Sequence, residues 1–72
     1  MKYYKVESSH WLNDLEFKSE LTLTEGQCFR IKKHDGYRDY PTRFKVKSVS
    51  DTPVYSGMIV EILEVDTNVD NF

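Results

Sequence analysis

The fold is decided between residues 28 and 47, which read CFRIKKHDGYRDYPTRFKVK. Two runs in this stretch, residues 29–32 and 44–47, alternate apolar with basic side chains. Successive side chains of a strand point to opposite faces, so this period of two predicts two strands, each with one apolar and one basic face. Asp35-Gly36 lies between the runs and is typical of a two-residue hairpin turn, with a longer loop over residues 33–40 as the alternative.

The two-residue turn fixes the register of the expected hairpin, because facing residues then have numbers that sum to about 71. Ile31 faces Tyr40 and Phe29 faces Thr42, which keeps the apolar side chains on one face. The opposite face then carries Arg30, Lys32, His34, Tyr37, Asp39, Arg43, Lys45 and Lys47.

Three further segments, residues 2–6, 21–24 and 58–66, have the composition of strands. In residues 58–66 the alternation slips at Ile62-Leu63, which indicates either a β-bulge or a strand covered on both sides. Residues 9–18 fit two structures. A serine before Trp11 can cap a short helix, which we favour, yet residues 15–18 also alternate like a strand.

The expected fold is therefore mainly β: a small, bent antiparallel sheet or open barrel of four to five strands, able to close fully, with one short N-terminal helix. At 72 residues the chain has room for one domain, which we place over residues 1–66, with residues 67–72 as an acidic, mobile tail. The expected core consists of Trp11, Phe17, Phe29, Phe44, Val46, Val60 and Ile62.

Composition points to a cytoplasmic protein with no membrane partner. No run approaches the roughly 18 apolar residues that span a bilayer, and the first residues lack the apolar core of a secretion signal. Cys28 is a single cysteine, which fits a reducing compartment. The chain has 8 residues with GC-rich codons (Gly, Ala, Arg and Pro) and 24 with AT-rich codons (Phe, Tyr, Met, Ile, Asn and Lys). This composition indicates a low-GC genome; the alternative is that a short β-rich chain has this composition by chance.

The sequence predicts no catalytic residue, metal site or cofactor. Ser, His and Asp occur together within residues 8–14, but a hydrolytic triad also needs an oxyanion hole that so short a chain has little backbone to build. Cys28, His10 and His34 lack the paired, short spacing of zinc ligands. Isolated glycines do not form a phosphate-binding loop, so we expect no enzymatic activity.

Charge is segregated along the chain. Residues 28–47 have a net charge of +5, whereas residues 48–72 hold five acids and no Lys or Arg. Lys and Arg with tyrosines nearby suit phosphates and bases, although basic residues also keep a sheet soluble and Glu61 could pair with Lys45 or Lys47. The candidate binding residues are Arg30, Lys32, Tyr37, Arg38, Tyr40, Arg43, Lys45 and Lys47.

The aromatic residues exceed what a core of this size can enclose. Tyr3, Tyr37, Tyr40 and Tyr55 are therefore expected to be at least partly exposed, as in protein interfaces, although tyrosine is also simply a good strand former. The sequence favours a small non-enzymatic interaction module, of the accessory kind carried by phages and mobile elements, that binds and modulates a host protein with an acidic surface. One alternative is a small β-barrel that binds single-stranded nucleic acid or RNA through its basic face. The other is an assembly protein that forms a small homo-oligomer through an open sheet edge instead of acting as a monomer.

Overall fold

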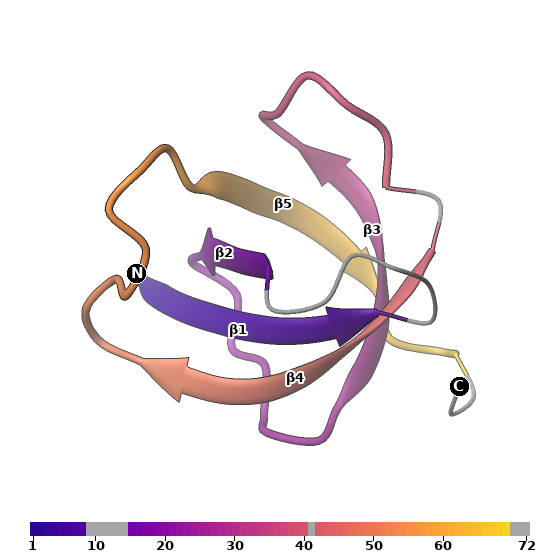
Figure 1. The fold of residues 1–72 in the computed structure, drawn as a ribbon. Coiled ribbons are helices and arrows are strands. Elements are labelled where there is room, and N and C mark those ends of the chain that lie inside the picture. Colours follow the sequence, from indigo (N-terminus) through magenta and orange to yellow (C-terminus); the bar gives the residue numbers. More distant parts are fainter. Residues whose placement is uncertain (9–14, 41, 70–72) are drawn as a thin grey trace.

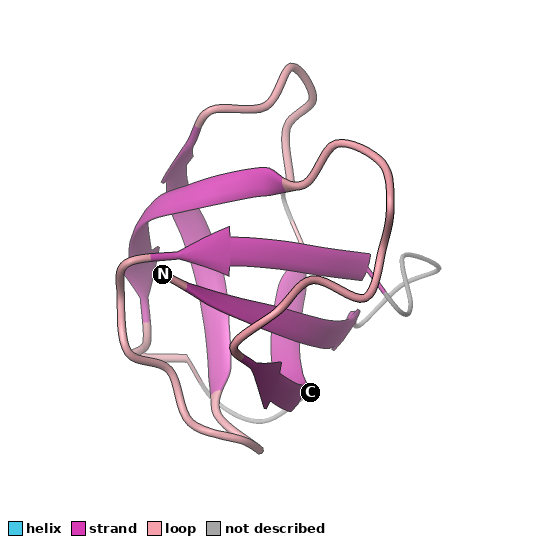
Figure 2. Cartoon of the chain, turned by 90° about the vertical axis from the view of Figure 1, so that its left-hand side faces the viewer, coloured by secondary structure: helices cyan, strands magenta, loops and turns pink. Residues whose placement is uncertain are grey.

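The computed structural model describes residues 1–8, 15–40 and 42–69, and within them the chain forms a closed five-stranded barrel (Figure 1). The strands are β1 (Lys2–Ser8), β2 (Leu15–Ser19), β3 (Cys28–His34), β4 (Arg43–Ser50) and β5 (Val60–Asp66). They follow one another around the barrel as β1-β2-β5-β3-β4, and Figure 2 shows them wrapped around a single interior. The mainly β fold is confirmed.

The sheet is antiparallel except at one pair. β1 runs antiparallel to β2 and β4, and β3 runs antiparallel to β4 and β5, but β2 and β5 are parallel, with Phe17 opposite Val60 and Ser19 opposite Ile62. The expectation of a wholly antiparallel sheet is wrong here for a geometric reason. Strand directions cannot alternate all the way around a closed ring with an odd number of strands, so at least one pair must be parallel.

The expected helix within residues 9–18 is wrong for residues 15–18, which are the part that the structure describes. Residues 15–19 form β2, and residues 9–14 lie outside the described residues. The alternation of residues 15–18 was the correct signal, because Phe17 and Ser19 point into the barrel and are buried. The buried Ser19 Oγ donates to the Ile62 carbonyl (2.8 Å) and accepts the Leu21 N–H (3.0 Å), which makes a polar residue acceptable inside.

Residues 21–24, expected as a strand, form a connection instead. Its backbone is bonded by a side chain: the buried Tyr4 hydroxyl donates to the Leu21 carbonyl (2.6 Å) and accepts the Leu23 N–H (3.1 Å). The following turn contains Gly26 with a φ of +87°, a conformation that glycine adopts without strain, and its N–H donates to the Val46 carbonyl (2.8 Å).

The register of β3 and β4 differs from the expected one by two residues. Phe29 lies opposite Phe44 and Arg30 opposite Arg43, and the connection from His34 to Arg43, described over residues 35–40 and 42, is longer than a two-residue turn. Gly36 lacks the positive φ that such a turn requires; instead a Cβ there would lie 3.0 Å from a Val60 methyl group, so Gly36 allows close packing. A shift of two keeps Phe29, Arg30 and Phe44 on their expected faces. The placement of His34 on the basic face is wrong, because the register shifts around Lys33 bring His34 opposite Ile62 and its ring against Tyr40.

β5 contains the irregularity that its sequence indicates. The register against β3 shifts after the Ile31–Val65 pair and again before His34 meets Ile62. Ile62 is buried and Val65 packs against the core, whereas Leu63 is 40% exposed. Of the two alternatives, the bulge is the correct one, because it returns Val65 to the inner face.

Eight buried hydrophobic side chains form the core: Tyr4, Val6, Phe17, Leu23, Phe29, Phe44, Val46 and Ile62. Five of the expected core residues are among them, Val60 packs partly buried against them, and Trp11 lies outside the described residues. The ring of Phe44 lies 5.5 Å from that of Phe17 and 5.7 Å from that of Phe29, measured between centroids. The described part of the chain contains no helix that is long and apolar enough to span a membrane.

Candidate functional site

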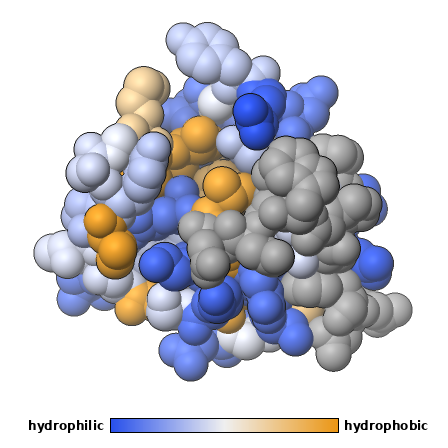
Figure 3. All heavy atoms as spheres, in the orientation of Figure 1, coloured by the Kyte–Doolittle hydropathy of each residue, from blue (hydrophilic) through white to orange (hydrophobic). Residues whose placement is uncertain are grey.

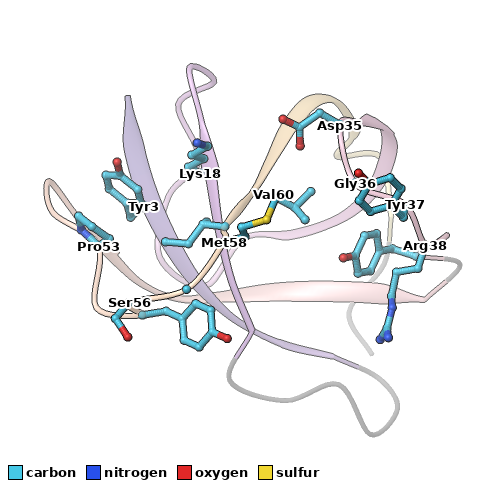
Figure 4. A pocket seen from close by; sticks show the side chains of 14 residues that line it. Tyr3, Lys18, Asp35, Gly36, Tyr37, Arg38, Pro53, Ser56, Met58 and Val60 are labelled. Carbon is cyan, nitrogen blue, oxygen red and sulfur yellow. The ribbon is translucent and has the colours of Figure 1, made fainter.

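Two loops border a groove on the barrel surface: residues 35–42 between β3 and β4, and residues 51–59 between β4 and β5. The larger hollow has a volume of about 790 Å³ and adjoins a second of about 650 Å³. Both hollows are lined by Arg38, Tyr40, Tyr55, Met58 and Val60. We call the two hollows together the loop groove. In Figure 4, Tyr3 and Pro53 lie on one side, Met58 and Val60 in the middle, and Asp35, Gly36, Tyr37 and Arg38 on the other.

The β4–β5 loop is anchored to β2 by a single carboxylate. Glu16 accepts the Val54 N–H with one oxygen (2.9 Å) and the Tyr55 N–H with the other (2.6 Å). Gly57 leaves room for the Tyr55 ring, because a Cβ there would lie 2.5 Å from it and would displace it. The loop thus holds Tyr55 and Met58 outward, with 60% and 90% of their surface exposed.

An ion pair joins the start of this loop to β1. Lys2 Nζ donates to Asp51 Oδ1, and both side chains are exposed. The hydrogen bond and then the charge of Lys2 lower the pKa of the Asp51 carboxyl, while the same two effects of Asp51 raise the pKa of Lys2. In water such a pair contributes little to folding, so we assign it to loop position and not to stability.

The β3–β4 loop is tied to β5 and to its own first residues. Asp35 Oδ1 accepts the Glu61 N–H (2.8 Å), and the Asp35 N–H donates to the Glu61 carbonyl (3.2 Å). At the end of β3, His34 Nδ1 accepts the Gly36 N–H (2.9 Å). This side of the groove is therefore held by backbone bonds to the barrel.

The two tyrosines of the β3–β4 loop have different roles. Tyr40 meets three rings edge-on, those of His34 at 4.9 Å, Phe17 at 5.2 Å and Phe44 at 6.2 Å, measured between centroids. It is half-buried and covers the end of the core while lining the groove. Tyr37, three residues earlier, is fully exposed. Both tyrosines were expected to be at least partly exposed, and both are, but only Tyr40 also packs against the core, through Phe17.

The charged side chains of the groove differ in the bonds that they already form within the protein. Both carboxylates already accept backbone N–H groups, Glu16 from the β4–β5 loop and Asp35 from Glu61 of β5. Lys18 and Arg38 line the larger hollow, and within the described part of the chain neither forms an ion pair. The groove therefore offers cationic groups to an incoming molecule.

The predicted binding residues divide into two groups. Tyr37, Arg38 and Tyr40 line the loop groove. The other five, which line neither hollow, are on the strands β3 and β4: Arg30, Lys32, Arg43, Lys45 and Lys47. The structure therefore separates the basic sheet face from most of the exposed rings.

Acidic residues of neighbouring strands border this basic face. Glu7 of β1 is opposite Lys45, and Asp66 of β5 is opposite Arg30. The expected pairing of Glu61 with Lys45 or Lys47 is wrong, because β3 lies between β5 and β4 and the partner of Glu61 in the register is Lys18.

Sequence reasoning missed several groove residues, notably Lys18, Pro53 and Met58. It did mark Tyr3, Tyr37, Tyr40 and Tyr55 as exposed aromatic residues, and all four line the larger hollow. Since they come from β1 and from two loops far apart in sequence, only the closed barrel brings them together. On the face shown in Figure 3, apolar residues are visible at the centre between hydrophilic neighbours.

Within residues 1–8, 15–40 and 42–69, no group of His, Cys, Asp and Glu is placed to hold a metal ion. Comparison of the chain with protein-family models, curated proteins and solved structures gave no match. The site is therefore interpreted from its own geometry.

Proposed function

We propose that this chain is a non-enzymatic interaction module that binds a partner protein in the loop groove. The observation that carries the proposal is the convergence of four tyrosines, Tyr3, Tyr37, Tyr40 and Tyr55, on one hollow. Tyrosine provides a large, rigid contact area with a polar end at low cost in side-chain entropy, and it is enriched at the energetic centres of protein interfaces.

The exposure of the groove side chains supports a role beyond folding. Met58 and Tyr37 are almost wholly exposed, so neither stabilises the core. The barrel nevertheless uses both oxygens of Glu16 to hold the loop that presents Tyr55 and Met58. Large apolar side chains gathered around a concave surface are typical of an interaction site.

Most of the basic side chains lie away from the groove rings, which favours protein over nucleic acid; the basic residues that line the groove are Lys5, Lys18 and Arg38. A surface for single strands needs cations along the backbone path and aromatic rings beside them. Here Arg30, Arg43 and Lys45 lie on the sheet outside the groove, and Glu7 and Asp66 border them. With a net charge of −2 for the whole chain, attraction of a polyanion is also weak at long range.

The wider biological role that we propose is that of a phage or mobile-element accessory protein that inhibits or modulates a host protein. Its support is compositional: residues with AT-rich codons predominate and alanine is absent, as expected of a low-GC genome. The groove itself supports only the binding function.

The experiment is an affinity capture from a low-GC bacterial lysate with matched variants. Tyr55→Ala with Met58→Ala alters the groove, while Val49→Ala with Leu63→Ala removes two exposed apolar side chains that lie outside it. We expect the affinity of the groove variant for the captured protein to fall at least tenfold, or by about 1.4 kcal/mol, and that of the control to be unchanged. A protein captured equally by both variants, also after nuclease treatment, contradicts a binding role of the groove.

A further inference from the structure

We propose that the segment bound in the loop groove is an extended peptide in the polyproline II conformation, containing proline and flanked by acidic residues. This inference rests on the proposed function, because it names the chemistry of the partner segment at the same site.

The closed barrel argues against the addition of a strand. Peptides often bind by pairing with an exposed sheet edge, where main-chain hydrogen bonds supply the affinity. Each of the strands β1–β5 already has a hydrogen-bonded neighbour on both sides. The affinity must therefore come from side-chain packing and from individual polar groups.

The walls of the groove match the second extended mode. A polyproline II segment has three residues per turn and no internal hydrogen bonds, so its carbonyl oxygens remain free to accept. Tyr3, Tyr37 and Tyr55 offer ring faces for prolines and hydroxyl donors for those carbonyls. Aromatic-lined grooves recognise such segments because little conformational entropy is lost on binding.

The two hollows together give the groove room for an extended segment. Tyr40, Tyr55 and Met58 line both hollows, so they stand between the larger one and the smaller one. Residues i and i+3 of a polyproline II helix project from the same side. Two prolines spaced in this way can therefore face the groove together.

The larger hollow carries two cations, Lys18 and Arg38, and one acid, Asp35, which favours an acidic flank. Glu16 and Asp35 are engaged with backbone N–H groups, whereas Lys18 and Arg38 line the larger hollow without an ion pair among the described residues. An acidic residue beside the prolines would meet these two cations. A basic flank would meet the same cations and be repelled.

The test uses synthetic ten-residue peptides on an array, followed by fluorescence anisotropy of the strongest binders. One set carries Asp-Glu before a Pro-x-x-Pro core with x varied; the second has Ala for Pro, and the third has Lys-Lys for Asp-Glu. We expect binding to the first set, with at least tenfold weaker binding to the other two.

Two charge-matched variants locate the contact. Arg38→Glu reverses a charge in the groove and Lys32→Glu reverses one on the exposed outer surface of β3, with the same change in net charge. Arg38→Glu should weaken the acidic peptides at least tenfold and Lys32→Glu should leave them unchanged. Equal losses in the two variants would overturn the inference, because the attraction would then come from net charge alone.

The outcomes also separate this inference from the proposed function. If no peptide of the first set binds while lysate capture still depends on Tyr55 and Met58, the polyproline inference fails and the binding function stands. Preferential binding of the alanine set overturns the inference in the same way. Binding of single-stranded oligonucleotides that is lost in Arg38→Glu, with no peptide bound, contradicts both proposals.

Discussion

The two tyrosines of the β3–β4 loop allow one residue type to be tested in two environments. Truncation of Tyr40 to Ala should destabilise the barrel strongly, while truncation of Tyr37 to Ala should not. Both residues belong to the loop over residues 35–42 and both line the groove. Only Tyr40 contacts core rings, those of Phe17, His34 and Phe44, whereas Tyr37 is fully exposed.

The expected magnitude follows from burial and ring geometry. Truncation of a fully buried aromatic side chain costs about 3–5 kcal/mol, and the half-buried ring of Tyr40 should account for roughly half of that, or about 2 kcal/mol. That cost already includes edge-to-face contacts, worth about 0.5–1.5 kcal/mol each, and because Tyr40 makes three of them we expect about 2–3 kcal/mol for Tyr40→Ala. Tyr37→Ala should change stability by less than about 0.5 kcal/mol.

Thermal denaturation followed by circular dichroism measures the difference. For a domain of this size about 1 kcal/mol corresponds to about 4–8 °C, so Tyr40→Ala should lower the Tm by about 8–24 °C. Tyr40→Phe keeps the ring contacts and should melt close to wild type. Equal melting temperatures for Tyr40→Ala and Tyr37→Ala would refute the placement of Tyr40 over the core.

Two further predictions concern polar groups. Tyr4→Phe removes the hydroxyl that bonds the Leu21 carbonyl and the Leu23 N–H, and both groups then lose that partner. Urea denaturation should therefore show a free energy of unfolding that is lower by about 1–3 kcal/mol. An unchanged midpoint would contradict the hydrogen-bonded connection. Asp51 should titrate below its usual pKa of 3.8 because Lys2 stabilises its charged form, so the contact holds above that pH and is lost as the pH falls through the lowered value. Lys2→Gln should raise the Asp51 midpoint, observed by carbon NMR of the carboxyl group, and identical midpoints with and without Lys2 would exclude the ion pair.

The faces of the strands could be predicted from the sequence, but the topology could not. Alternation places Phe29, Phe44 and Val46 inside, and this assignment survives a register error of two residues because the side-chain period is also two. The position of the bulge near Ile62 was readable for the same reason. The parallel contact of β2 with β5 depends on barrel closure, which no local pattern encodes.

The candidate site was predictable in its residue type and not in its location. An excess of aromatic residues predicted that Tyr3, Tyr37, Tyr40 and Tyr55 are not all core, but their convergence depends on two loops that only the folded barrel brings together. The anchoring role of Glu16 was equally hidden, because its partners are backbone N–H groups 38 and 39 residues away. The turn signal at Asp35-Gly36 misled because Gly36 serves close packing instead of a tight turn.

The central claim is that partner binding occurs in the loop groove and not on the basic sheet face. Amide chemical-shift mapping of the isotope-labelled chain, titrated with the captured partner protein, tests it most directly. We predict that the largest changes fall on residues of the two loops and on Tyr3 and Lys18, with the outer face of β3 and β4 little affected. Changes concentrated on Arg30, Arg43 and their neighbours, with the loops unchanged, would contradict the account.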